Sequence, residues 1–165
     1  MPSINDKKYQ AVILYLAQKL GGEIRGKKKL AKLLYFVDFD FFEKHNRSVT
    51  GDQYRALPMG PVPQHMMDVV SELVQAGELT TTAIEEVPGY NPTEIYSVGV
   101  HSEDTTLDTE EKVIIDRVIK KYGHLNGRQL EVLSHAEAPY IGTEPGKEIP
   151  YELTFYRGTE FGDDN

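Results

Sequence analysis

The fold of this chain is decided by residues 29–63, KLAKLLYFVDFDFFEKHNRSVTGDQYRALPMGPVP. The stretch begins with a segment that is apolar nearly all the way round, which is the pattern of a helix enclosed by other elements. It then breaks near residue 51 into a short extended run at 53–57. It ends in a Pro-Met-Gly-Pro turn at 58–61, which we expect to lead straight into another helix. These are the parts of a scaffold, and no residue among them is arranged for chemistry.

Length and composition favour one compact domain over residues 1–165. The 165 residues, 39% of them apolar, permit a single core. The absence of cysteine excludes a disulfide framework and thiolate metal sites, and it fits a reducing cytoplasm. No apolar run is long enough to cross a bilayer and the first 20 residues lack a signal-peptide layout, so we expect no membrane insertion. Residues 162–165 are expected to be frayed.

The net charge of −8 is unevenly distributed along the chain. Residues 1–50 carry 10 Lys/Arg and 5 Asp/Glu, which gives +5, whereas residues 51–165 carry 8 and 21, which gives −13. A uniformly acidic surface would repel nucleic acid, but a divided one can meet a basic partner on one side. The alternative is that the charge serves solubility alone.

Apolar periodicity predicts five helices. They are expected at residues 6–20, 27–45, 63–77, 108–122 and 127–136. Asp108 followed by Glu111 has the pattern of a capping box, and Asn126 is expected to cap the last helix. We expect Val74 to lie in the buried stripe of the third helix and Leu133 in that of the last.

The helix at 27–45 carries two apolar faces, one aliphatic and one aromatic, and we therefore place it at the centre of the fold. Two β-rich runs at 79–87 and 94–100 are joined by Pro-Gly-Tyr-Asn-Pro, a strong turn composition. A helix followed by a hairpin is the order of a winged helix. The predicted fold is α+β and mainly α, a single compact domain with a central buried helix and a small β-hairpin. After residue 139 the chain is expected to be irregular, with a short ordered piece at 149–156.

Candidates for metal binding and nucleophilic catalysis are weak. The five histidines are scattered without ligand spacing, so we expect no metal and no cofactor. Ser134 and His135 are neighbours on a helix, so they point about 100° apart and cannot form a nucleophile–base pair directly. We expect His135 to hold the end of its helix against Pro139.

Three carboxylates, Asp38, Asp40 and Glu43, lie in the aromatic helix. A carboxylate pair can perform acid–base catalysis, but only in a cleft that raises one pKa. We expect these residues instead to mark the solvent edge of the helix or to pair with Lys44 and Arg47. There is also no glycine-rich loop to cradle a phosphate, and we predict that the protein is not an enzyme.

The strongest nucleic-acid signal is a basic cluster at the start of the central helix. It consists of Arg25, Lys27, Lys28, Lys29 and Lys32. Cations at this density could grip phosphates in a salt-dependent way. The third helix, which would read bases in a winged helix, instead offers the carboxylates Asp68 and Glu72. The cluster is therefore a candidate nucleic-acid contact, but we expect nucleic acid not to be the partner.

The extended run and the Gly60-Pro61 corner favour a protein partner. Tyr, Arg and Met are enriched where proteins meet, and Tyr54, Arg55 and Met59 stand beside this stiff turn. A rigid element also lowers the entropy that is lost on binding. The alternative, equally supported by the residues, is that Tyr54 and its neighbour at position 57 simply cover the central helix.

The order of KLAKLLYFVDF, YRALPMGPVPQHM, LSHAEAPY and EIPYE resembles the Panacea family of SocA-like antitoxin domains over nearly the entire chain. The most specific positions of this resemblance are Leu33, Tyr35, Gly60, Pro61, Val62, Ser134 and His135. The family usually has tryptophan where this chain has Tyr140, and an aromatic residue where it has Met66 or Met67.

The resemblance implies an antitoxin that is encoded beside a toxin in a bacterial or phage genome and neutralises it by direct complex formation. On that basis the residues expected to bind the toxin are Tyr54, Arg55, Met59, Gly60 and Pro61. Two alternatives stay open: a winged-helix transcriptional regulator, and an adaptor that hands the toxin to a protease. A homodimer is a further candidate assembly.

Overall fold

The computed structural model describes residues 4–99 and 106–162. The helices are α1 (Asp6–Lys19), α2 (Lys27–His45), α3 (Met66–Gln75), α4 (Thr109–Tyr122), α5 (Gly127–His135), α6 (Ala138–Ile141) and the 3-10 helix η1 (Tyr151–Tyr156). The strands are β1 (Glu23–Arg25), β2 (Tyr54–Leu57), β3 (Gly60–Pro63), β4 (Thr80–Ile84) and β5 (Thr93–Ser97). The predicted α+β, mainly helical fold is confirmed.

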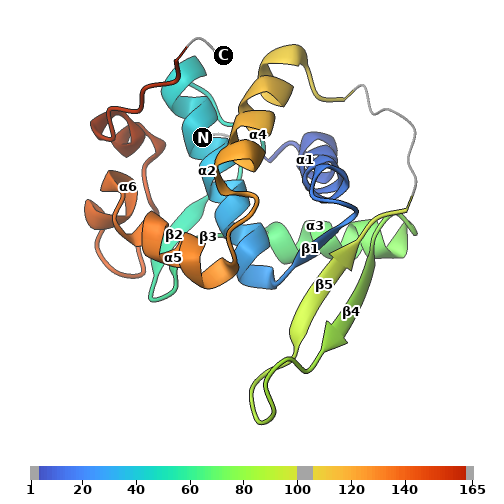
Figure 1. The fold of residues 1–165 in the computed structure, drawn as a ribbon. Helices are drawn as coiled ribbons and strands as arrows, with labels where there is room; N and C mark the ends of the chain where they lie inside the picture. The colour runs from blue at the N-terminus through green and yellow to red at the C-terminus, as the bar shows by residue number, and fades with distance from the viewer. Residues whose placement is uncertain (1–3, 100–105, 163–165) are drawn as a thin grey trace.

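Helix α2 is the axis of the molecule, as predicted (Figure 1). Every residue from Leu30 to Phe41 is buried, including one lysine and two aspartates. The helix packs against α4, α5, β3 and η1, so it has neighbours on all sides. Its aromatic residues meet those of later elements: Phe36 stacks on Tyr122 with ring centroids 4.0 Å apart, and Phe39 stacks on Tyr151 at 4.6 Å. Each fully buried aromatic ring stabilises the fold by about 1.5–3 kcal/mol.

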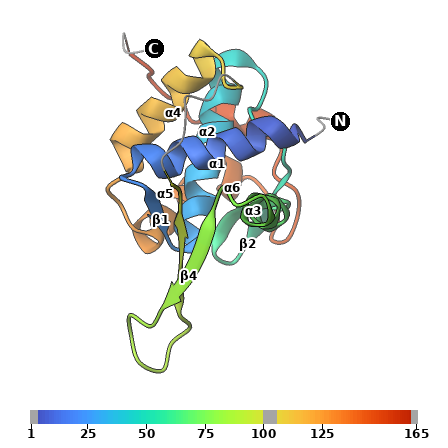
Figure 2. The same cartoon turned by 90° about the vertical axis from the view of Figure 1, so that its right-hand side faces the viewer.

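A three-stranded antiparallel sheet has the order β1-β5-β4. The predicted hairpin is confirmed as β4 and β5, and it projects from the body beside α3 (Figures 1 and 2). Strand β1 was not predicted, because three residues are too few to show the alternation of apolar and polar side chains that marks a strand. Ile24 of β1 pairs with Tyr96 of β5, so the strand joins distant parts of the sequence. With β1 between α1 and α2, the element order is that of a winged helix with an inserted β2–β3 hairpin.

The prediction that the Gly60-Pro61 corner leads directly into a helix is wrong. These residues begin β3, which pairs antiparallel with β2, so that Pro63 lies opposite Tyr54 and the turn falls at Pro58 and Met59. Proline is tolerated in β3 because a strand at the edge of a two-stranded sheet has positions that need no N–H. The helix that follows begins three residues after Pro63, at Met66.

The helix termini are capped as predicted, but two residues that were predicted to be buried are exposed. Both capping arrangements are confirmed: Asp108 forms a capping box with Glu111, and Asn126 caps α5. Val74 and Leu133 were expected to be buried, but they are 38% and 42% exposed. The ordered piece predicted at residues 149–156 is confirmed as η1, and α6 lies in the stretch expected to be irregular. The predicted end of the second strand at residue 100, His101 and the frayed residues 163–165 lie outside the described residues.

Candidate functional site

Asp38 is fully buried and holds the segment that follows α2. Its carboxylate accepts hydrogen bonds from the backbone N–H of Val49 and of Thr50, both at 2.9 Å, and from the hydroxyls of Thr50 and Tyr54, both at 2.6 Å. Burial raises the pKa of Asp38 to about 6, against the opposing effect of these hydrogen bonds. The Tyr54 side chain is therefore locked inside, and the prediction that it covers α2 is the one the structure bears out.

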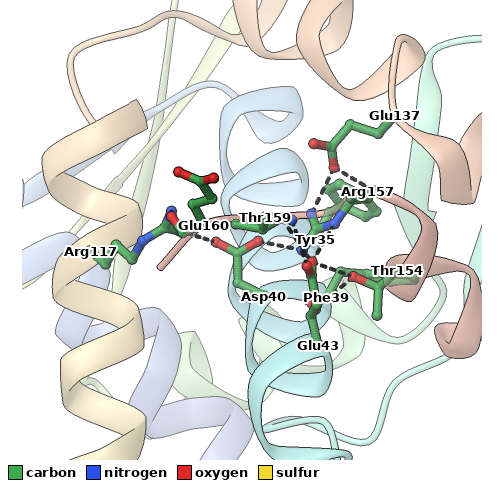
Figure 3. A network of polar contacts seen from close by, with 10 residues as sticks. All are labelled: Tyr35, Phe39, Asp40, Glu43, Arg117, Glu137, Thr154, Arg157, Thr159 and Glu160. Atoms are coloured by element: carbon green, nitrogen blue, oxygen red, sulfur yellow. Dashed lines mark hydrogen bonds and ion pairs between the residues drawn. The ribbon is translucent and has the colours of Figure 1, made fainter. Parts of the chain in front are cut away.

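Asp40 and Glu43 belong to a second buried network, centred on Arg157 (Figure 3). The Arg157 guanidinium donates to Asp40 at 2.7 Å, to Glu43 at 2.7 and 2.9 Å, and to Glu137 at 2.8 Å. Arg117 reaches Asp40 from the opposite side, at 3.0 Å. Burial raises the pKa of Asp40, while the two arginines oppose that rise. The network ties α4, α6 and the end of η1 to α2.

The expectation that these carboxylates lie at a solvent edge and pair with Lys44 or Arg47 is wrong. Arg47 instead lies 3.6 Å from Glu111, and Lys44 lies over the ring of Phe161 at 5.8 Å. The sequence could not reveal this pairing because Arg157 and Asp40 are 117 positions apart. The carboxylates are saturated with donors, so the arrangement is that of a structural ion-pair network.

Four of the residues that carry the family resemblance, Gly60, Pro61, Ser134 and His135, meet Lys32 and Tyr140 at one place. We call these six residues the joint. The Lys32 side chain is 1% exposed, and its Nζ donates to the carbonyl of Pro61 at 3.0 Å. A Cβ added to Gly60 would lie 3.0 Å from Lys32 Cε and 3.1 Å from Ser134 Oγ. Helix α2, strand β3 and helix α5 therefore approach here as closely as a glycine allows. Burial lowers the pKa of Lys32 to about 8.

The end of α5 completes the joint. The His135 ring stacks on Tyr140 with centroids 4.6 Å apart, and the Tyr140 hydroxyl donates to the carbonyl of Leu57 at 2.7 Å. His135 therefore holds this corner through Tyr140, and the expected contact with Pro139 stays a prediction. Ser134 donates its hydroxyl to the backbone of its own helix, at Glu131. Serine and histidine thus act on different partners, as their adjacency predicted.

The remaining motif residues are also structural. Leu33 is fully buried, and Tyr35 is fully buried with its hydroxyl donating to Glu137 at 2.8 Å. Val62 is half-buried on β3, next to Pro61. These positions specify how the elements pack together.

A surface cavity of about 650 Å³ opens beside the joint. It lies between the first half of α2, the β2–β3 hairpin and the start of β5, and we call it the Met59 pocket. Its lining includes Lys27, Lys28, Ala31, Met59, Val62 and Met66. Met59 stands on the turn at its edge and is 58% exposed. The pocket thus unites one end of the basic cluster with the hairpin that the sequence indicated as a protein-binding element.

The model of the family described as antitoxin SocA-like, Panacea domain, matches residues 30–140. This match covers two thirds of the chain and contains every residue of the joint. The chain belongs to the SocA-like Panacea family. No curated protein matches the sequence, and no solved structure matches it. The predicted resemblance is confirmed over residues 30–140, and the EIPYE motif at 148–152 lies outside the match.

The Panacea domain exposes only part of the predicted toxin-binding set. Met59 and Arg55 are exposed, and Arg55 donates to the carbonyl of Gly146 at 3.1 Å. Tyr54, Gly60 and Pro61 are buried. The buried members can position the exposed ones but cannot themselves contact a partner.

The basic cluster of the Panacea domain is largely engaged by the protein itself. Lys32 binds Pro61, Lys29 binds the carbonyl of Gly123 at 2.7 Å, Lys28 pairs with Glu131 at 2.6 Å, and Arg25 pairs with Glu23 and Glu86 at 3.1 Å. Lys27 is exposed. The five cations that the sequence grouped as a candidate nucleic-acid contact do not form one exposed cluster, because Lys32 lies in the core and Lys28, Lys29 and Arg25 are bonded to separate partners.

Residues 4–99 and 106–162 contain neither a three-residue metal-binding group nor a membrane-spanning helix. In this part of the Panacea domain, no three histidine or acidic side chains are grouped so as to hold a metal ion. None of the helices in the same residues has the length and apolarity required to span a bilayer.

Proposed function

We propose that this Panacea domain is an antitoxin that neutralises a cognate toxin by binding it directly through the surface around the Met59 pocket. The observation that carries the proposal is the large exposed side chain of Met59, presented at the edge of a cavity by a turn that the joint holds in place. The absence of cysteine is consistent with a toxin and antitoxin that meet in the cytoplasm.

The β2–β3 hairpin is suited to recognition because it is fixed on both sides. On one side, β3 is anchored to α2 by the Lys32 hydrogen bond. On the other, the backbone of β2 bonds to the segment at 147–149: Ala56 N–H donates to Lys147 at 2.9 Å, and Ile149 N–H donates to Tyr54 at 2.7 Å. A partner therefore meets a surface that loses little conformational entropy on binding.

Methionine is a suitable contact residue at such a site. Its unbranched, polarizable side chain adapts to irregular apolar surfaces and is over-represented where one surface meets different partners. Val62 and Met66 continue the apolar surface into the pocket, and Lys27 supplies charge in its lining. Arg55 lies opposite Val62 on the neighbouring strand of the hairpin. This combination of an apolar centre and a polar rim is typical of protein interfaces.

Met59→Asp is expected to weaken toxin binding by roughly 10–100-fold, because it places a carboxylate in the desolvated part of the interface. Arg55→Glu is expected to weaken binding as well, because it reverses a charge beside that part. The test is co-expression of each variant with the toxin encoded beside this gene, scored as growth rescue, together with the Kd of the purified proteins. The circular dichroism spectrum and the melting temperature should stay unchanged, since both side chains are exposed.

Val132→Asp is the matched control for Met59→Asp. Val132 is 64% exposed on α5 and does not line the Met59 pocket, so this variant should bind and rescue like the wild type. If Met59→Asp and Arg55→Glu rescue growth as well as the wild type does, the Met59 surface is not the binding site.

A further inference from the structure

A second surface hollow lies between α3 and the β4–β5 hairpin. This cavity of about 330 Å³, which we call the α3–β4 groove, is lined by Met67, Val70 and Val74 from α3 and by Thr81, Ala83 and Tyr96 from the sheet. The three α3 positions follow one another at helical spacing, so they form one side of that helix. Thr81 pairs with Tyr96, so both side chains lie on the sheet face that turns toward α3. Met67 and Val74 are exposed in the free protein, although they are apolar.

The groove runs along an open edge of the sheet. Among residues 4–99 and 106–162, the strand order β1-β5-β4 leaves β4 paired on one side only. Its residues Thr80 to Ala83 are exposed, and the strand Thr-Thr-Thr-Ala-Ile carries no charged residue or proline that would block the pairing of another strand. Every second N–H and C=O of β4 therefore points into solvent and is available to an extended segment of another polypeptide.

The charge of α3 and the β4–β5 hairpin indicates what kind of partner can bind in the groove. Residues 66–99 contain six acidic residues and no lysine or arginine. The acidic residues are Asp68, Glu72, Glu78, Glu85, Glu86 and Glu94. Arg25 compensates one of them, Glu86, at 3.1 Å. The surface formed by α3 and the hairpin is therefore strongly negative.

Nucleic acid and a second copy of this chain both fit this charge poorly. In helix-turn-helix proteins, the helix in the position of α3 enters the major groove and needs cations against the phosphates. Carboxylates at Asp68 and Glu85 would repel the phosphate backbone. Two copies paired edge to edge through β4 would bring two negative surfaces together, which is unfavourable as well.

We propose that the α3–β4 groove receives an extended, lysine- or arginine-bearing segment of the toxin, which adds to β4 as a further strand. Alternate apolar side chains of that segment enter the groove against Met67 and Val74, and its basic side chains meet the surrounding carboxylates. Glu94 lines both this groove and the Met59 pocket, so one partner can cover both. The inference rests on the proposed antitoxin function and assigns the shape and charge of the segment that is bound.

The first measurement is the Kd between the purified toxin and the full-length Val74→Lys variant. Lysine at this exposed position fills the groove and repels a basic segment, so we expect the Kd to rise by about tenfold or more while the melting temperature stays unchanged. Val132→Lys is the matched control, because it makes the same change at an exposed valine outside the groove, and its Kd should equal that of the wild type. Between 50 and 300 mM salt, the wild-type Kd should weaken several-fold.

Hydrogen exchange tests the added strand itself. In the complex, amide exchange in residues 80–84 should slow relative to the free antitoxin, because a bound strand takes up the outward N–H groups. If the wild type binds the toxin but Val74→Lys binds equally well and residues 80–84 exchange at the free rate, the groove proposal is wrong and the antitoxin function stands. Protection of residues 80–84 that increases with protein concentration in the absence of toxin would show a second copy on β4 and would also overturn it. If the wild type does not bind the toxin at all, both proposals fall.

Discussion

Replacement of Arg157 by alanine is expected to lower the free energy of unfolding by about 3–5 kcal/mol. The Arg157 side chain is 5% exposed and donates to three carboxylates, those of Asp40, Glu43 and Glu137. Burial lowers its pKa, but Asp40 and Glu137 outweigh this effect and raise it, so the guanidinium stays charged. Without Arg157, Glu43 and Glu137 lose their arginine, and Asp40 keeps only Arg117. Hydroxyl and backbone donors remain on Glu43 and Glu137, but buried carboxylates that lose their counter-ion are strongly destabilising, since they retain the cost of desolvation.

The measurement is urea unfolding at pH 7, followed by circular dichroism. Arg128→Ala is the matched control, because Arg128 is an exposed arginine on α5, and we expect it to change the free energy of unfolding by less than about 0.5 kcal/mol. A loss below about 1 kcal/mol for Arg157→Ala would show that the network in Figure 3 does not stabilise the fold. Arg157 lies outside the family match at 30–140, so this result also reports how firmly the C-terminal segment is attached to α2.

Gly60→Ala is expected to destabilise the protein by about 2–4 kcal/mol, as the sum of backbone strain and overpacking at the joint. The φ angle of Gly60 is +108°, which residues with a Cβ rarely adopt. The new Cβ would also press on Lys32 Cε at 3.0 Å and on Ser134 Oγ at 3.1 Å. Lys32 cannot easily withdraw, because it is buried and its Nζ is bonded to Pro61.

Gly146→Ala separates the two contributions to this effect. Gly146 also has a positive φ, +81°, but nothing lies within 4 Å of its added Cβ. It should therefore show backbone strain alone, about 1 kcal/mol. Thermal and urea unfolding of both variants give the difference, and equal losses would mean that the close approach of α2, β3 and α5 at Gly60 contributes nothing.

The helical part of the fold was predictable because its signals are local. The apolar residues on every face of the segment 27–45 correctly predicted both the ends of α2 and its position at the centre of the fold. The pairs Asp108 with Glu111 and Asn126 with Gln129 satisfy the first N–H groups of α4 and α5 within four residues, so these helix starts could be read from short patterns.

The parts that failed depend on partners far away in the sequence. Strand β1 exists only because β5 lies beside it, about 70 positions later. The prolines of β3 were predicted to form a turn before a helix, because their pairing with β2 is not visible in the local sequence. Lys32 was counted with the surface cations, although its position in a helix that is apolar on all sides was a signal that it is buried.

The candidate site was predicted only in outline. The sequence placed Arg55 and Met59 beside a rigid turn, and both are exposed, but Tyr54 was turned inward by Asp38 from the preceding helix. The α3–β4 groove was not anticipated, even though residues 56–111 contain no lysine or arginine at all. That charge pattern became interpretable only once the sheet order showed that β4 is an open edge.

The proposed antitoxin function requires that the protein inactivate its toxin by occupying the toxin's surface. A titration of purified toxin with purified antitoxin, without protease or ATP, tests it most directly when toxin activity and the masses of both chains are followed. We predict that activity falls in proportion to added antitoxin, ends at a fixed molar ratio and leaves both masses unchanged. Activity that persists until a protease is added, or that disappears at far less than one equivalent with a covalent change in the toxin, would contradict the account.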